Sequence, residues 1–202
     1  SGYLGRDRFA GSTDFGAGWG NRAATLRWNQ AFGGRLFSKA TAAYGTYDYR
    51  LEFSAGADSL QWTSRVRSLD LKVDQTLYVS PTNTIEFGFQ LTDQNIRPGD
   101  LLPTSKGTFN ARQIEARNTL LPAAYLGQEL AFGERVSVRY GLRYAGYQRR
   151  GAGTVYDYVD DQAVTWNANL GRYEPGVVRD STTYGRGARI AGAGGFEPRI
   201  SG

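Results

Sequence analysis

The side chains that most often carry catalysis are scarce in this sequence. Its 202 residues include no His and no Cys. A histidine general base, a Ser-His-Asp triad, an imidazole or thiolate metal site and a disulfide are therefore excluded within it. A hydrolase with paired carboxylates needs two acids that converge in one pocket, and the 19 acidic residues are scattered along the chain. We therefore expect neither an enzyme nor a cofactor or metal site.

Two stretches come nearest to ligand-binding motifs. Tyr156-Asp157-Tyr158-Val159-Asp160-Asp161 offers the carboxylates that Ca²⁺ prefers, but it lacks the glycine and the terminal Glu of an EF-hand loop. We interpret it as a solvated acidic loop. Gly185-Arg186-Gly187 and residues 192–195 are glycine-rich but lack the Lys-Ser/Thr of a phosphate-binding loop. We interpret them as flexible loop and strand entry.

The formal net charge of +5 raises the question of a nucleic-acid partner. Arg and Lys are spread along the chain, often beside Asp or Glu, and no basic run reaches five residues. We therefore expect no nucleic-acid binding. Arg139 and Arg143 suit two roles that the sequence leaves open, the attraction of anionic solutes and pairing with acidic neighbours.

The composition favours strands over helices. The chain contains 27 Gly, 13 Tyr, 10 Phe and 4 Trp. Aromatic residues favour strands, and glycine is a poor helix former. No window approaches the ~20 apolar residues of a membrane helix, but a membrane strand needs only ~9–11 residues with one apolar face.

Residues 68–92 give the clearest pattern. Leu69, Leu71 and Val73 alternate strictly with Asp70, Lys72 and Asp74. Ser80-Pro81-Thr82-Asn83 has the composition of a tight turn, and Ile85, Phe87 and Phe89 then alternate with Glu86, Gly88 and Gln90. This segment therefore predicts a hairpin with one apolar and one polar face.

Two further hairpins are expected. In residues 135–147, Val136, Val138, Tyr140 and Leu142 oppose Ser137, Arg139, Gly141 and Arg143. The strand before them contains Pro122, which suggests a strand start or a bulge because proline removes a ladder donor. Residues 21–32 are expected to form a strand that turns at Gly33-Gly34-Arg35 into a long strand over residues 36–53. Residues 40–43 of that strand show too little contrast between apolar and polar side chains to be assigned to a face.

Short and long connections tend to alternate. The connections at residues 33–35, 80–83 and 131–134 are short, whereas those at residues 94–116 and 147–195 are long, with residues 54–60 between these extremes. Residues 95–100, with Pro98-Gly99, are expected to form a turn, and residues 147–195 show little alternation. Short periplasmic turns and long external loops are typical of bacterial outer-membrane barrels.

A soluble sheet with one solvated face is the main alternative, and two features weigh against it. Full charges are closely spaced on the polar face, as expected for a water-filled lumen. Aromatic residues gather towards strand ends on the expected apolar face, as expected near a membrane boundary (Tyr47, Tyr49, Tyr78, Tyr144 and Tyr147). We therefore predict an all-β, antiparallel up-and-down transmembrane β-barrel segment of about six to seven strands of a larger barrel.

This fold assigns side chains to two surroundings. The residues expected to face the lumen are Asp70, Lys72, Asp74, Glu86, Arg139 and Arg143. The residues expected to face lipid are Leu69, Leu71, Val73, Ile85, Phe87, Phe89, Val136, Val138, Tyr140 and Leu142.

Three short stretches resemble the barrel strands of TonB-dependent receptors of the Bacteroidetes type. They are Gly18-Trp19-Gly20-Asn21 followed by Leu26-Arg27-Trp28-Asn29, then Tyr140-Gly141-Leu142-Arg143-Tyr144, and finally Phe196-Glu197-Pro198-Arg199-Ile200. Their order and spacing fit along most of residues 18–200.

The resemblance implies a 22-stranded, plugged barrel in the outer membrane of a Gram-negative bacterium. It implies uptake of a scarce nutrient (a siderophore, cobalamin or a glycan) with energy passed by the TonB complex, which contacts parts of the protein outside this chain. Residues 1–202 are then expected to be a partial barrel domain without a plug domain or signal peptide, and with lipid, cargo and the TonB complex as partners.

The long loops are the expected site of cargo contact. Their exposed aromatic and charged residues are the candidates: Arg97, Tyr156, Tyr158, Trp166 and Arg172. Two other functions stay open, a small structural or adhesive outer-membrane barrel without cargo and a soluble binding domain.

Overall fold

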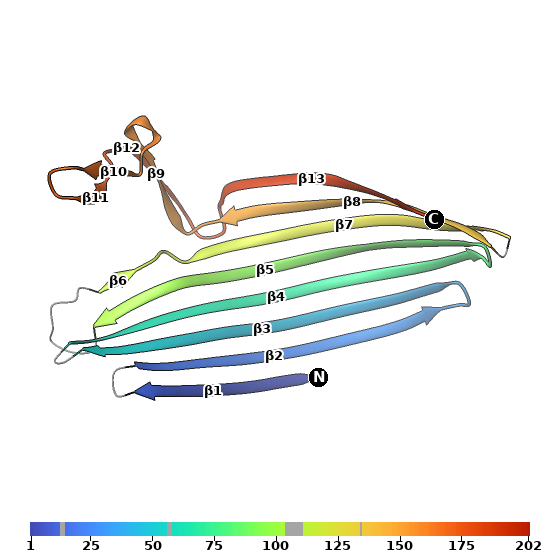
Figure 1. Ribbon diagram of the computed structural model, residues 1–202. Coiled ribbons are helices and arrows are strands. Elements are labelled where there is room, and N and C mark those ends of the chain that lie inside the picture. Colours follow the sequence, from blue (N-terminus) through green and yellow to red (C-terminus); the bar gives the residue numbers. More distant parts are fainter. Residues whose placement is uncertain (13–14, 56–57, 104–110, 134) are drawn as a thin grey trace.

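Long antiparallel strands, joined up and down, form one sheet that accounts for most of the molecule (Figure 1). The computed structural model describes the chain except for residues 13–14, 56–57, 104–110 and 134. The order in the sheet is β1-β2-β3-β4-β5-β7-β8-β13, and β6 pairs with β5. The bounds are β1 (Gly2–Ser12), β2 (Phe15–Phe32), β3 (Leu36–Ala55), β4 (Asp58–Ser80), β5 (Asn83–Pro103), β6 (Arg112–Gln113), β7 (Arg117–Phe132), β8 (Val136–Arg150) and β13 (Arg189–Ser201). The all-β, antiparallel up-and-down fold class is thus confirmed.

The nine strands of this sheet exceed the number expected, mainly because β1 was not foreseen. Its sequence mixes small, charged and apolar residues on both parities, as Leu4, Arg6 and Arg8 show on one of them. Alternation is therefore weak in β1. Pairing along β2 defines it instead, from Gly2 opposite Ala24 to Ala10 opposite Gly16.

Short hairpins occupy the connection between β8 and β13. β9 (Gly153–Tyr158) pairs with β12 (Val178–Tyr184), and β10 (Val164–Asn167) pairs with β11 (Arg172–Pro175). The short 3₁₀ turn η1 (Val159–Asp161) lies between them. These strands are too short to show alternation in sequence, which explains why an irregular loop was expected. Among the described residues, no helix has the length and apolar character needed to cross a membrane.

Prolines lie inside three strands of the large sheet, Pro98 in β5, Pro122 in β7 and Pro198 in β13. The turn expected at residues 95–100 is wrong, because these residues belong to β5. Pro98 and Gly99 are accommodated by a register shift opposite Thr63 and Arg65, since an extra residue bulges out of β5 there. Pro122 neither starts a strand nor shifts the register: β7 pairs with β8 in one register on both sides of it, and pairing lapses only locally.

The short turns lie together at one end of the sheet, at the right in Figure 1. The expected turns at residues 33–35 and 80–83 are confirmed. In the third, at residues 131–134, Glu134 lies outside the described residues. Gly33 and Gly133 have positive φ angles of 60° and 68°, a conformation that favours glycine.

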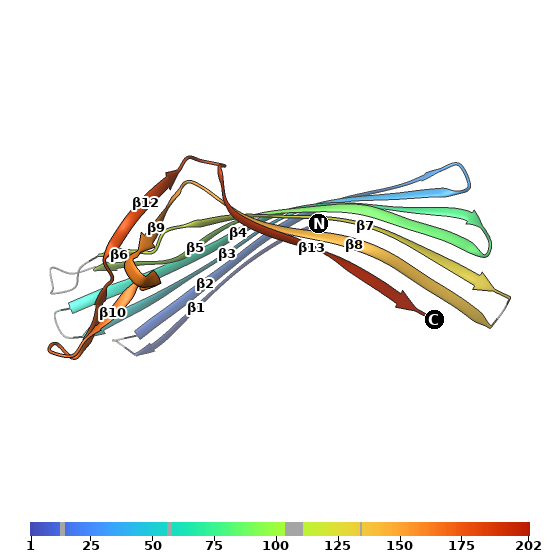
Figure 2. The same cartoon turned by 90° about the horizontal axis from the view of Figure 1, so that it is seen from above.

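The turns are staggered from one hairpin to the next. The row of paired residues that starts at Leu36, where the first turn ends, passes through Leu77, Ile85 and Gln128. Leu77 lies three residues before the end of β4, and Gln128 lies four before the end of β7. Such an offset accompanies tilted strands in barrels. The described sheet is strongly twisted (Figure 2) and does not close, because β1 and β13 are its edges.

Register divides the side chains between two faces, which we call the Leu71 face and the Lys72 face. Directly paired residues point to the same side, so Leu71 shares its face with Leu91, and Lys72 shares its face with Gln90. All ten residues expected to face lipid lie on the Leu71 face. All six residues expected to face the lumen lie on the Lys72 face.

Among the described residues, no second layer covers the part of the Leu71 face that contains Leu71 and its neighbours. Leu69, Leu71 and Val73 are 43%, 40% and 38% exposed, and Leu126 is 59% exposed. Within the described chain, Ala123 is the only buried hydrophobic side chain. A soluble sandwich would bury these side chains between two sheets. Here they form a continuous apolar surface, which we call the apolar belt.

The two faces exchange polarity along the strands. The exchange follows the paired row of Tyr44, Leu69 and Asp93. On the turn side of this row the Leu71 face of β2 to β8 has no charged side chain among the described residues. The charged residues of that part of the sheet all lie on the Lys72 face: Arg27, Lys39, Asp70, Lys72, Asp74, Glu86, Glu129, Arg139, Arg143, Glu197 and Arg199.

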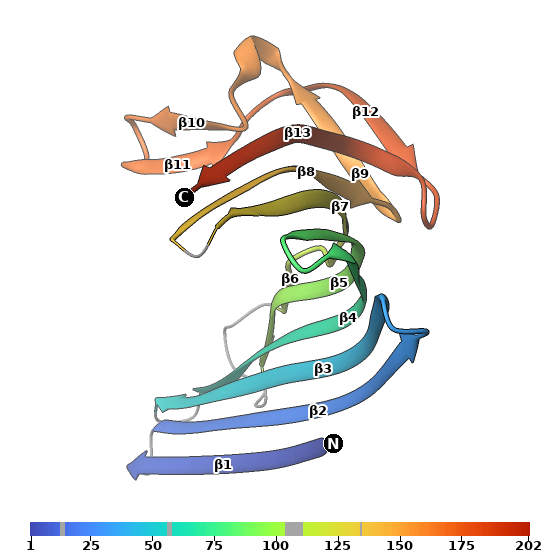
Figure 3. The ribbon, with the colours of Figure 1, turned by 90° about the vertical axis from the view of Figure 1, so that its right-hand side faces the viewer.

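The aromatic residues at strand ends need a correction for this reason. Tyr144 lies on the Leu71 face as expected, paired with Ala124. Tyr47 and Tyr49 lie beyond the exchange and belong to the Lys72 face, as do Tyr78 and Tyr147. Assigning all five to one apolar face is wrong. Tyr78 and Tyr147 have the parity opposite to Leu71 and Tyr144 in their own strands, and register places Tyr47 and Tyr49 on the Lys72 face. Figure 3 shows the twist of the sheet from the end at which the short turns lie.

Candidate functional site

Beyond the exchange row, the Leu71 face becomes rich in arginine. Arg67 lies two residues before Leu69, and Arg65 lies two residues before Arg67, on the same side of β4. Register places Arg97 of β5 opposite Arg65. On the other flank, Thr46 lies between Arg67 and Arg22 of β2. Four arginines of three strands therefore lie near each other, and we call Arg22, Arg65, Arg67 and Arg97 the rim arginines.

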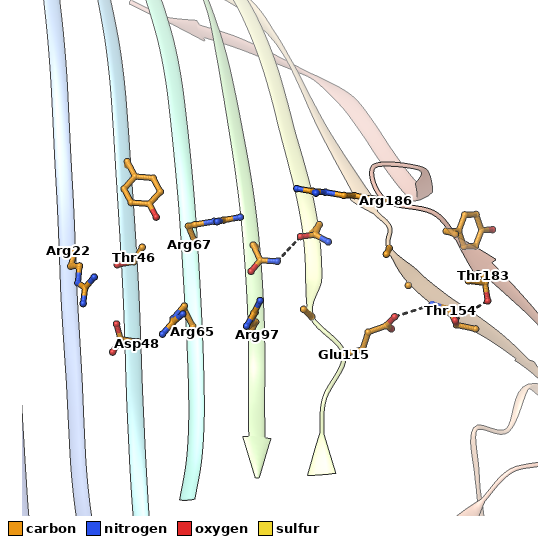
Figure 4. Close-up of a pocket in the computed structure, with 17 residues that line it drawn as sticks. Arg22, Thr46, Asp48, Arg65, Arg67, Arg97, Glu115, Thr154, Thr183 and Arg186 are labelled. Atoms are coloured by element: carbon orange, nitrogen blue, oxygen red, sulfur yellow. Dashed lines mark hydrogen bonds between the residues drawn. The ribbon is translucent and has the colours of Figure 1, made fainter. Parts of the chain in front are cut away.

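These arginines line a pocket of about 860 Å³ (Figure 4). The sheet forms one wall. Thr154 of β9, Thr183 of β12 and Arg186, from the segment before β13, belong to the opposite wall. The pocket is therefore built where the base of the β9–β12 hairpin meets the loop end of the long strands.

The acidic residues of the pocket do not neutralise it. Asp48 and Glu115 are the two acids among its lining residues, against five arginines. Glu115 is already engaged, because its carboxylate accepts a hydrogen bond from the Thr154 backbone N–H at 3.1 Å and lies 3.7 Å from the Arg149 guanidinium.

The rim arginines and Arg186 form no ion pair within the described part of the chain. Guanidinium groups present a fork of donors that matches carboxylate and phosphate oxygens. The pocket is thus suited to bind an anion, and none of its groups suits it for acid–base or nucleophilic catalysis.

Several charges on the Lys72 face are paired, although Arg27 and Lys39 form no ion pair within the described chain. The Lys72 ammonium lies 3.0 Å from the Asp74 carboxylate, which also accepts a hydrogen bond from the Tyr125 hydroxyl at 2.5 Å. Tyr125 lies over Gly88, its register partner, where a side chain on residue 88 would collide with it. This cluster joins β4, β5 and β7.

Arg139 and Arg143 are also paired. Arg139 donates to the Glu129 carboxylate at 2.6 Å and lies 3.9 Å from Glu86. Arg143 lies 3.9 Å from Glu197. Of the two roles left open by the sequence, the structure shows pairing with acidic neighbours.

No family model, curated protein or solved structure matches this chain. The pocket and the two faces are therefore the observations on which a function must rest.

Of the loop residues expected to contact cargo, only Arg97 lines the pocket. Tyr156 and Tyr158 lie on β9 with ring centroids 6.3 Å apart. Trp166 packs against Tyr173 at 5.1 Å, and Arg172 pairs with Glu174 at 3.2 Å. These five residues are thus spread over several elements and do not form one site.

Sequence reasoning missed Arg22, Arg65, Arg67 and Arg186. A signal was present for two of them: Arg65 and Arg67 have the same parity as Leu69 and Leu71 in one strand. That change from charged to apolar on a single face marks the exchange row. In the acidic stretch, Asp157 is bound by Arg179 at 2.6 Å.

Proposed function

We propose that this chain is part of an outer-membrane β-barrel, with the Leu71 face towards lipid and the Lys72 face towards the interior. The apolar belt is the observation that carries the proposal. It crosses neighbouring strands without interruption by charge, and no other part of the described chain covers it. Large exposed apolar surfaces are rare on soluble monomers and mark contact with a membrane or a partner.

Strand length and turn geometry support the same proposal. β2, β3, β4, β5, β7 and β8 have between 15 and 23 residues, which exceeds the ~9–11 needed to cross a bilayer. The excess lies on the loop side of the exchange row. The staggered short turns at one end correspond to the periplasmic side of such a barrel.

We further propose that the complete barrel is a TonB-dependent receptor that imports a scarce nutrient of the siderophore, cobalamin or glycan class. The support is the resemblance of three strand sequences and the presence of two short hairpins above β8, which enlarge the loop end. The open edges of the described sheet require further strands for closure, as a larger barrel supplies.

The lipid contact is tested by placing a charge on each face at equal depth. Phe87→Arg lies on the Leu71 face, and Thr76→Arg lies one row away on the Lys72 face beside Glu86. Arginine near the bilayer midplane costs about 2–4 kcal/mol on a lipid-facing site. We expect Phe87→Arg to reduce the folded fraction of the full-length protein in phospholipid vesicles, and Thr76→Arg to leave it unchanged. Equal effects would contradict the proposal.

The transport function is tested in cells that make the full-length protein. Uptake of radiolabelled cargo candidates should depend on the gene, on TonB and on the energised inner membrane. Normal membrane insertion with no uptake of any candidate would favour the structural barrel. Release of the protein into buffer without detergent would contradict both barrel functions. Alanine at Arg97, Tyr156 and Trp166 should weaken cargo affinity if the loops bind cargo.

A further inference from the structure

The rim arginines lie on the face that the proposed function turns towards lipid, immediately beyond the apolar belt. Arg67 and Arg65 precede Leu69 by two and four residues, or about 7 and 13 Å along the strand. Arg22 and Arg67 lie in one paired row with Thr46 between them, and Arg65 and Arg97 lie opposite each other two residues further out. The arginines therefore form a basic margin along the loop-side border of the belt.

The border at the turn end has a different chemistry. There the Leu71 face ends in apolar, aromatic and neutral polar residues, such as Phe32, Leu77, Gln128 and Val136. On the Leu71 face of the described strands, four unpaired arginines lie at one border and no charged residue lies at the other, which distinguishes the two sides of the bilayer. Arg35 and Arg135 lie in the turns, outside the strands. The loop end is the external side of a barrel with short periplasmic turns.

A polar headgroup layer about 5–8 Å deep adjoins the hydrocarbon on each side of a bilayer. Arginine side chains that start in or just above this layer can reach its phosphates, because their apolar stems lie along the neighbouring apolar surface. A guanidinium binds a phosphate with two parallel hydrogen bonds.

We propose that the rim arginines bind the phosphate groups of phosphorylated lipid headgroups in the outer leaflet. The inference rests on the membrane orientation given under Proposed function, but not on import of a cargo. Arg22, Arg65, Arg67 and Arg97 supply the positive charge from the sheet, and Arg186 supplies it from the opposite wall. A pocket of about 860 Å³ accommodates a sugar phosphate headgroup.

The absence of ion pairs supports this assignment. On the Lys72 face the arginines Arg139 and Arg143 have acidic partners within 4.0 Å. The rim arginines have none in the described chain, and Asp48 and Glu115 leave a positive excess around the pocket. An anionic lipid headgroup supplies the missing countercharge.

The test measures lipid binding to the full-length protein in neutral maltoside micelles. Lipid A, a glucosamine disaccharide with phosphate groups, is the probe, and native mass spectrometry counts the bound lipid. We expect Arg65→Gln/Arg67→Gln to weaken lipid A binding by about 20-fold, since each arginine near an anionic surface contributes about fivefold. Arg65→Lys/Arg67→Lys keeps the charge and should lose less.

Arg27→Gln/Lys39→Gln is the matched control, because Arg27 of β2 and Lys39 of β3 both lie on the Lys72 face. It removes two positive charges, as the test variant does, and should change lipid A binding by less than about twofold. Equal weakening by the control would show a general charge effect and overturn the proposal. Unchanged binding in the double variant would overturn it as well.

Soluble anions separate a lipid site from a small-molecule site. Inorganic phosphate and glucosamine 6-phosphate should compete only weakly, because they lack the acyl chains that hold a lipid against the apolar belt. Competition at equal concentrations would overturn the lipid assignment in favour of a soluble anion. Loss of nutrient uptake with intact lipid A selectivity would refute the transport function alone.

Discussion

At the scale of the residue, the molecule uses its charges in two ways. On the Lys72 face, Asp74 serves two partners at once, the Lys72 ammonium and the Tyr125 hydroxyl. Its side chain is 21% exposed, so its charge is screened less than that of a surface ion pair. On the Leu71 face, the rim arginines have no such partners in the described chain. Paired charges join strands, and unpaired ones are available to a ligand.

Asp74→Ala should lower the free energy of unfolding by about 1–2 kcal/mol, because it leaves the Tyr125 hydroxyl and Lys72 without their shared acceptor. Asp74→Asn should cost less, since its amide oxygen still accepts from Tyr125. Urea unfolding of the full-length protein in micelles, followed by tryptophan fluorescence, measures both. The effect of Asp74→Ala should shrink in a Tyr125→Phe background, and additive effects would show that the two residues are not coupled.

At the scale of the element, the hairpin turns are the positions most sensitive to a single methyl group. Gly33 has a φ of 60° whereas Gly34, its neighbour, does not lie in the left-handed region, and both have open space around them. An alanine at residue 33 and an alanine at residue 34 would therefore differ only in the backbone conformation that each has to adopt. This pair isolates the contribution of the turn that joins β2 and β3.

Gly33→Ala should destabilise the protein by about 1–2 kcal/mol, the cost of a left-handed conformation for a residue with a Cβ. Gly34→Ala should have an effect near zero or a slight gain, because alanine restricts the unfolded chain. The midpoints of urea unfolding compare the two variants. A larger loss for Gly34→Ala would mean that the turn has a different conformation.

Prediction from the sequence succeeded where a strand alternates strictly and a turn residue ends it. Residues 68–92 satisfy both conditions, and the hairpin of β4 and β5 has the expected faces and turn. β1 is not predicted, because its charged and apolar residues occur at the same parity and give no alternation. The hairpins of β9 to β12 are not predicted, because strands of four to seven residues contain too few repeats of the apolar–polar alternation.

The candidate site was harder to predict than the strands. Register decides which residues of neighbouring strands lie side by side, and register cannot be read from one strand. Arg22, Arg67 and Arg97 come from three strands and meet only through pairing. The loop residues selected by exposure and residue type were of the right kind, but only Arg97 lies where the strands bring arginines together.

At the scale of the whole molecule, the sheet has two zones and two faces. In the turn-side zone, the charged residues of the described long strands lie only on the Lys72 face, which also contains apolar residues such as Phe37 and Leu121. In the loop-side zone, the Leu71 face is basic, and Trp62 and Tyr47 lie on the Lys72 face. This arrangement fits a wall that crosses hydrocarbon over part of its height and continues into water above it.

Spin labels on single cysteines should reproduce this map, since the native chain has no cysteine. In phospholipid vesicles, labels at Leu69, Leu71 and Val73 should collide with oxygen more often than labels at Asp70, Lys72 and Asp74. Beyond the exchange row, a label at Arg65 should instead collide with a water-soluble nickel complex. Oxygen contact without period two along β4 would contradict the orientation.

Among the residues that the structure describes, Ala123 is the single buried hydrophobic one, and this has a consequence for the newly made chain. A polypeptide without a buried core gains little free energy by folding in water. Its apolar rows therefore stay exposed and can bind other apolar surfaces before the chain reaches its final location. In the proposed outer-membrane barrel, such a chain needs a chaperone between synthesis and insertion, and lipid acyl chains then cover the rows that the chaperone covered.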